Sequence, residues 1–186
     1  MTDGAKRFTE PDPETMDAEL RAFHDRLCEH RGWLPGPYRI WLEYPEFAQV
    51  MEQVSRFHRE TSTLPKILKE LAIITTVRYW RAQYAWTSHA KSARAAGVAD
   101  EVVNAIRDRK PPRFGDESQA AVYAFCRENL EDHAVGAATF ERAAAAVGRK
   151  GVIELIGLMS HYCAVAFTLN SYDVPPANGV APELKD

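Results

Sequence analysis

Four ionisable side chains stand out within one apolar, aromatic stretch of the chain, residues 65–97. They are Glu70, Arg78, Arg81 and His89. Ionisable groups in apolar surroundings need partners, and such groups often form functional sites. An imidazole exchanges protons near neutral pH, and a carboxylate beside it can orient the ring or act as the base itself. We therefore take His89 and Glu70 as candidate catalytic residues.

The aromatic and basic neighbours are candidate substrate-binding residues. A tyrosine hydroxyl donates a hydrogen bond to a carboxylate or enolate oxygen, an arginine pairs bidentately with a carboxylate, and tryptophan rings form pocket walls or core. Each also has a structural interpretation, as a core residue, an interface aromatic or an ion-pair partner. A histidine in the apolar last segment is a further candidate for the same cavity. The candidate binding set is Tyr84, Trp86, Arg78, Arg81, Trp80 and His161.

A helix over residues 65–97 would place the two candidate catalytic residues on one broad face. Pro65 suits the first turn of a helix, and Gly97 suits its C-terminal end. At about 100° per residue, Glu70 and His89 lie about 100° apart around an ideal continuous helix. A break near residues 82–84 would change that angle. The structural alternative is a buried Glu70 bound by an arginine and a core His89 satisfied by its neighbours.

Helical periodicity and helix-end signals continue along the rest of the chain. Asp12–Pro13, Pro45, Asp100 and Asp116 are start signals, and Gly32 and Gly148 are stop signals. No stretch reads as a run of alternating strands. The sequence therefore predicts an all-α fold in one domain over residues 1–186, with residues 1–11 as a flexible lead-in.

The apolar pattern also predicts which side chains are buried. In the helix that begins at Pro45, we expect the buried stripe to be Phe47, Val50, Met51, Val54 and Phe57. Residues 152–172 are apolar on nearly every side, which favours a core or subunit-interface helix over a membrane span. Four histidines in charged surroundings are expected at the surface: His24, His30, His58 and His133.

Composition excludes several classes of function. The 23 basic and 26 acidic residues give a net charge of −3, which offers no basic field for nucleic acid. Cys28, Cys126 and Cys163 are too far apart for a metal motif or a disulfide framework. No metal-binding spacing or glycine-rich phosphate loop is present. With a polar N-terminus, the sequence predicts a cytoplasmic protein without a metal or cofactor, whose partner is a small-molecule substrate.

Residues 65–97 also resemble the carboxymuconolactone decarboxylase family, which includes the alkylhydroperoxidase D-like proteins. The family pattern is a leucine-rich helix with a glutamate, followed by a short motif ending in histidine. Leu68, Glu70 and Leu71 match the first part, and Tyr84, Trp86 and His89 match the second. Residues 36–38, 44–47, 152–155 and 161–175 resemble other family segments, so the resemblance covers roughly residues 35–176.

The resemblance implies a compact multi-helix alkylhydroperoxidase D-like fold, a pocket and a homo-oligomer. Ala82 and Ala85 stand where peroxidase-type members carry two redox cysteines, and alanine cannot form the thiolate that this chemistry needs. The decarboxylase-like branch often has a glutamate at the position of Ala85, and that is missing too. We expect a cofactor-independent, carboxymuconolactone decarboxylase-like enzyme acting on a small cyclic organic acid or lactone. The alternatives are another proton-transfer reaction (elimination, hydration or isomerisation) and a non-catalytic binding or scaffold protein.

Overall fold

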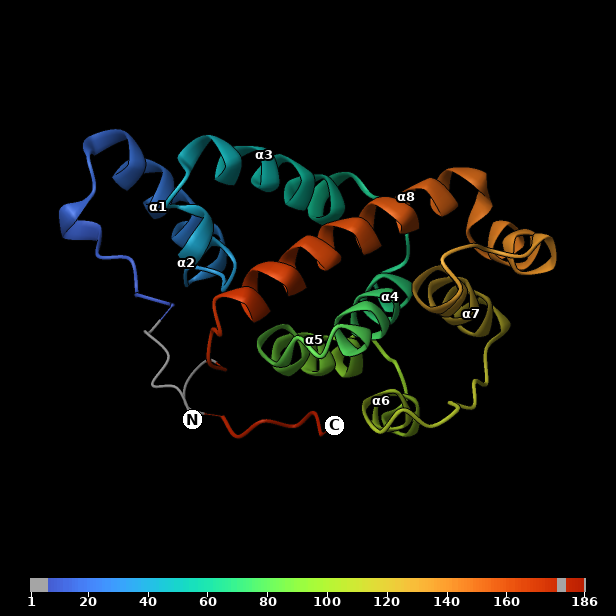
Figure 1. Ribbon diagram of the computed structural model, residues 1–186. Helices are drawn as coiled ribbons and strands as arrows, with labels where there is room; N and C mark the ends of the chain where they lie inside the picture. The colour runs from blue at the N-terminus through green and yellow to red at the C-terminus, as the bar shows by residue number, and fades with distance from the viewer. Residues whose placement is uncertain (1–6, 177–179, 186) are drawn as a thin grey trace.

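The computed structural model describes residues 7–176 and 180–185, and these form a helical fold without strands (Figure 1). About 70% of the protein is helical, which confirms the all-α prediction. A 3₁₀ turn at Pro13–Thr15 precedes the first α-helix, and a π-helical turn at Phe57–Thr61 follows the third. The α-helices are α1 (Ala18–Arg31), α2 (Tyr38–Trp41), α3 (Pro45–Arg56), α4 (Lys66–Tyr79), α5 (Gln83–Ala95), α6 (Asp100–Arg107), α7 (Glu117–Glu131) and α8 (Ala137–Ser171).

Helix α4 is the central element of the fold. It packs against α5, α6, α7 and α8, and residues 71–78 are all buried. A helix that is apolar on nearly every side is shielded from water only when other elements cover it on every side. Figure 1 shows α8 crossing the molecule between α3 and the pair α4 and α5, so α8 is the second element around which the fold is built.

Several of the predicted helix ends are confirmed. Gly32 closes α1 in the left-handed conformation, with φ 75°. The Asp116 side chain accepts a hydrogen bond from the backbone N–H of Gln119 at the start of α7. Gly148 interrupts α8, because its φ of 73° and ψ of 161° lie outside the helical region. Glycine adopts such angles without the steric cost that a Cβ would add.

The stretch over residues 65–97 is two helices rather than one. Helix α4 ends at Tyr79 and α5 begins at Gln83, so the break lies slightly before the predicted position. Arg81, in the break, has a φ of 54°, an unusual conformation for a residue with a side chain. The angle expected for a continuous helix therefore does not apply, and tertiary packing decides how α4 and α5 face each other.

The predicted buried stripe of α3 is wrong for four of its five residues. Met51 is buried, but Phe47, Val50, Val54 and Phe57 are between 36% and 55% exposed. The buried side of α3 also includes Ala48, which is fully buried. Apolar periodicity identifies a face that avoids water, and it does not say whether the chain itself covers that face.

The predicted flexible lead-in needs a correction at its described end. Residues 1–6 lie outside the described part of the chain. Phe8 is buried beneath the guanidinium of Arg39, and the Arg7 side chain donates a hydrogen bond to the carbonyl of Ser171. Residues 7 and 8 are therefore packed against the helical body.

Within the described residues, α8 is the helix with enough length and apolar character to cross a membrane. Half of its most apolar window is buried inside the protein, and Gly148 divides the helix. Both features fit a core helix of a globular protein.

Candidate functional site

A cavity of about 570 Å³ lies between α4 and α5 on one side and α8 on the other. The turn at residues 33–38 and the end of α3 complete its walls. Each long helix contributes residues spaced three or four apart, which project from one helix face. These are Lys66, Lys69, Glu70 and Ile73 from α4, Tyr84, Ala85, Ser88, His89 and Ser92 from α5, and Leu158, His161, Tyr162, Val165 and Leu169 from α8.

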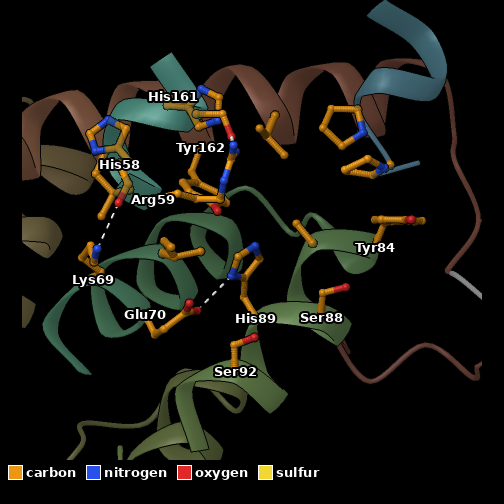
Figure 2. A pocket seen from close by; sticks show the side chains of 18 of the residues that line it. His58, Arg59, Lys69, Glu70, Tyr84, Ser88, His89, Ser92, His161 and Tyr162 are labelled. Atoms are coloured by element: carbon orange, nitrogen blue, oxygen red, sulfur yellow. Dashed lines mark hydrogen bonds and ion pairs between the residues drawn. The ribbon is translucent and has the colours of Figure 1, made fainter. Parts of the chain in front are cut away.

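Glu70 and His89 meet on the wall of this cavity, 19 positions apart in sequence. The distance between His89 Nδ1 and Glu70 Oε2 is 2.9 Å. Their side chains are 22% and 14% exposed. In the neutral ring, an Nδ1–H that donates to Glu70 leaves the lone pair on Nε2. Figure 2 shows that this second nitrogen points away from Glu70, toward the wall that carries Tyr162 and His161. The arrangement presents an oriented imidazole to a ligand.

The wall opposite His89 is aromatic. The ring of Tyr162 meets His89 edge to face at a centroid distance of 4.9 Å, and His161 lies 5.4 Å from Tyr162 on its other side. His161, predicted as a cavity residue, does line the cavity and is buried. Its ring centroid lies 6.2 Å from that of His58.

His58 corrects a prediction, because it was expected at the surface and is 7% exposed. The π-helical turn after α3 carries it into the cavity wall, beside Gly157 of α8. Burial lowers the pKa of His58, and a hydrogen bond with the Gly157 backbone only partly offsets that effect. No sequence pattern indicated this placement, since the charged neighbours of His58 are typical of an exposed helix end.

Tyr84 and Ala85 occupy the first turn of α5 and line the cavity. Tyr84 lies against the backbone of Gly36. Ala85 stands one helical turn before His89, where the family resemblance places the second redox cysteine. No cysteine lines the cavity within the described residues. This site therefore lacks the nucleophile of a thiol peroxidase.

Three predicted binding residues lie away from the cavity. Trp86 is fully buried, and its indole N–H donates to Glu183. Trp80 packs edge to face on Phe167 and donates to the sulfur of Cys163. Arg81 is exposed in the break between α4 and α5. The break turns residues 80 and 81 away from the face that α4 and α5 share. They therefore do not line the cavity, although they are close to His89 in sequence.

Arg78 is also outside the cavity and does not pair with Glu70. Its Nε donates to the carbonyl of Arg107 at 2.6 Å, and one terminal nitrogen donates to the carbonyl of Lys185 at 3.1 Å. Eight residues separate Glu70 from Arg78, which is about 12 Å along a helix. Glu70 and Arg78 therefore belong to different regions of the protein.

Three cations that the sequence analysis did not select line the cavity: Arg59, Lys66 and Lys69. The Lys69 ammonium donates to the carbonyl of His58, and Arg59 pairs with Glu52 outside the lining. Glu70 is the one carboxylate among the described residues that line the cavity. The signal was present, because Lys66, Lys69 and Glu70 share the helix stripe of i, i+3 and i+4 positions.

The described residues contain no group of three or more histidine, cysteine, aspartate or glutamate side chains that could hold a metal ion.

Part of the chain matches a known family. The model of the carboxymuconolactone decarboxylase family matches residues 45–128. That range includes α3, α4, α5 and α6 with most of α7, and it contains both Glu70 and His89. No curated protein matches the sequence.

Solved structures show the same fold at low sequence identity. A peroxidase-related protein from Ralstonia eutropha JMP134, described as an alkylhydroperoxidase AhpD core, superposes with a TM-score of 0.76 at 12% identity over 92% of both chains. A peroxidase-related protein from Silicibacter sp. TM1040 gives 0.75 at 13% identity, over 94% of this chain and 96% of that one. The debrominase Bmp8 gives 0.70 at 16% identity over 87% of both chains. The resemblance seen in the sequence is confirmed: residues 45–128 match the carboxymuconolactone decarboxylase family, and the fold is that of the alkylhydroperoxidase D-like proteins.

Proposed function

We propose that this protein is a cofactor-independent enzyme that uses acid–base chemistry on a small, cyclic, anionic molecule, in the manner of a carboxymuconolactone decarboxylase. The observation that carries the proposal is the 2.9 Å contact between His89 and Glu70 on the wall of a 570 Å³ cavity. A positioned imidazole within reach of a ligand typically contributes about 10²–10⁴-fold to a proton transfer. Glu70 orients the ring through its contact with Nδ1.

The charge of the lining supports an anionic substrate. Arg59, Lys66 and Lys69 line the cavity, and Glu70 is the one carboxylate among its described lining residues. The Lys69 ammonium donates a hydrogen bond to the carbonyl of His58, and this bond fixes the position of its positive charge in the cavity wall. These lysines take over the carboxylate-binding role that the sequence analysis gave to Arg78 and Arg81. An ammonium is well suited to holding a carboxylate that does not react.

The reaction class follows from what these groups can do together. In a decarboxylation, the bond to the leaving carboxylate breaks and its electron pair moves into a conjugated carbonyl, which gives an enolate and CO₂. Protonated His89 would then deliver a proton to the enolate carbon. Tyr84, which lines the cavity from the same helix as His89, can donate a hydrogen bond to the developing oxyanion. Elimination, hydration and isomerisation would use the same groups.

The proposal of a cyclic substrate is supported by the structure of a protein with a similar fold. A C82A variant of the debrominase Bmp8 has been solved in complex with 2,3,4-tribromopyrrole, a small cyclic compound. The cavity of the present protein is lined by Tyr162 and Tyr84, whose aromatic faces could stack on a ring-shaped ligand. The alternative of a non-catalytic scaffold would be favoured by a filled core at this position, where the structure has a cavity.

A panel of cyclic carboxylic acids and lactones tests the proposal. Each compound is assayed for turnover and for binding, with the wild-type protein, with His89→Asn and with the exposed control His133→Asn. The proposal expects turnover by wild type and by His133→Asn, and binding without turnover by His89→Asn. Binding of a ligand that none of the three proteins converts would instead support a binding protein.

A further inference from the structure

A second, smaller cavity of about 180 Å³ lies between α4, α6 and α7. It shares no lining residue with the first cavity. Ile73 lines the first cavity and Thr75 the second, and these positions are about 200° apart around α4. The two cavities therefore lie on opposite sides of the same helix.

Arg78 is buried in the wall of this second cavity with an incomplete set of partners. It is 4% exposed, and two of its nitrogens donate to carbonyl oxygens. Its remaining nitrogen, Nη1, is buried and has no hydrogen-bond partner among the described residues. A buried guanidinium needs both its hydrogen bonds and its charge compensated. Burial lowers the pKa of Arg78, and the positive charges of Arg109 and Arg81 lower it further, opposed by Asp108.

Arg127 on α7 also has an incomplete set of partners, although its side chain is 40% exposed. One terminal nitrogen donates to the Tyr123 hydroxyl at 3.1 Å, and the other pairs with Glu131. Its Nε is buried and has no partner within the described part of the chain. Burial raises the pKa of Tyr123, which keeps the phenol protonated. Because Tyr123 accepts from Arg127, its own O–H remains a donor for a ligand.

We propose that this cavity is a binding site for a small oxyanion, either a phosphate or a carboxylate group. Three arginines line it, namely Arg78, Arg109 and Arg127, against the single carboxylate of Glu131. A guanidinium fork matches both kinds of oxyanion. Arg78 provides the buried donor, and the half-buried Arg127 and the exposed Arg109 complete the basic lining. The volume equals that of about six water molecules, which suits inorganic phosphate or a short carboxylate.

Calorimetric titration with inorganic phosphate and with succinate, at constant ionic strength maintained with chloride, tests the site. The key variant is Arg109→Gln, because Arg109 is exposed and its removal leaves the buried contacts intact. Arg113→Gln is the matched control, since Arg113 is an exposed arginine of the same loop region that does not line the cavity. Lys66→Gln removes a cation of the first cavity and separates the two places where an anion can bind.

We expect saturable binding of at least one of the two anions to wild type, Arg113→Gln and Lys66→Gln. Binding to Arg109→Gln should be weaker by roughly tenfold or more, as for loss of a charge-assisted hydrogen bond. Arg127→Lys, which keeps the charge but loses the fork, should also bind more weakly. The anion that binds more tightly identifies the ligand chemistry. Absence of saturable binding would overturn the proposal, as would equal losses in the Arg109 and Arg113 variants, or a loss confined to Lys66→Gln.

Discussion

The aromatic ring of Tyr84 lies directly against the backbone of Gly36. A Cβ built at Gly36 would stand 2.3 Å from Cε1 of Tyr84 and within 2.8 Å of two further ring atoms. Real Cβ atoms do not approach other atoms so closely, so any side chain at residue 36 must displace the tyrosine. Since both residues line the first cavity, this contact sets the position of one wall.

Gly36→Ala is therefore expected to move Tyr84 and to weaken substrate binding. Overpacking of this kind typically costs about 1–3 kcal/mol of stability. Gly115→Ala is a suitable control, because a Cβ at Gly115 meets no atom within 4 Å. Thermal unfolding and KM should change in the Gly36 variant and stay close to wild type in the Gly115 variant. An unchanged KM in a folded Gly36→Ala protein would show that Tyr84 does not contact the substrate.

Activity should not depend on any cysteine. Burial raises the pKa of Cys126 to about 12, and burial also raises the pKa values of Cys28 and Cys163. All three thiols therefore stay protonated at neutral pH, and none lines the first cavity within the described residues. We expect a variant with all three changed to alanine to retain turnover per folded molecule, at some cost in stability from the cavity left at Cys126. Complete loss of turnover in the folded variant would show that a thiol takes part in the reaction.

Glu154 should make stability depend on acid pH. Its carboxylate is buried and accepts hydrogen bonds from the Ser62 hydroxyl and from the backbone and hydroxyl of Thr63. Burial alone would raise the pKa of Glu154, but these hydrogen bonds outweigh it and the pKa is lowered below its usual value of 4.5. The stabilisation is therefore complete above pH 4.5 and is lost as the pH falls through the folded-state pKa.

Replacing Glu154 with Gln should remove this part of the acid sensitivity. The amide keeps the shape but turns one acceptor into a donor, so we expect a loss of about 1–3 kcal/mol near pH 7. Denaturant unfolding at pH 7 and at pH 3.5 measures both effects. The difference between wild type and variant should shrink at the lower pH. A constant difference would mean that folding does not lower the pKa of Glu154.

The exposed apolar face of α3 and α8 leads us to propose that the protein is a homo-oligomer. Val50 is 55% exposed, and Ile153 and Ile156 on α8 are 70% and 48% exposed. Apolar patches spanning neighbouring helices usually mark interfaces. Light scattering should give a multiple of 20.9 kDa for wild type.

A charge placed on this face should reduce the mass. We expect Ile153→Glu to dissociate the assembly, while the same change at Val180, an exposed valine near the C-terminus, should leave it intact. A wild-type mass of a single chain at micromolar concentration would contradict the proposal.

The sequence predicted helix ends better than helix faces. Gly32, Asp116 and Gly148 act through local backbone geometry and capping, so their effect is the same in any fold. The exposed stripe of α3 was misassigned, because whether a second chain covers an apolar face depends on assembly and not on periodicity.

The candidate site was predictable in its central pair and not in its surroundings. Glu70 and His89 came from residue type and family pattern, and the structure brings them together despite the break at Arg81. That break turned Trp80 and Arg81 away, while tertiary packing brought His58 into the cavity. Arg78 lies on the other side of α4, in the wall of the second cavity. Because α4 is buried on all sides, its sequence pattern does not show which of its faces lines the functional cavity.

The catalytic role of the Glu70–His89 pair can be separated from a structural role by measuring turnover and thermal unfolding on the same variants. His89→Asn keeps a similar size and one hydrogen bond to Glu70, but it cannot exchange a proton near neutral pH. Glu70→Gln keeps the shape of the carboxylate and removes its negative charge.

The most direct measurement is the turnover number of His89→Asn against wild type, on a substrate found by the panel, with the fraction of folded protein determined in the same sample. We predict a loss of about 10²–10⁴-fold with a melting temperature within a few degrees of wild type, and a smaller loss for Glu70→Gln. Full turnover by a folded His89→Asn protein would contradict the assignment of His89 as the proton-transfer residue.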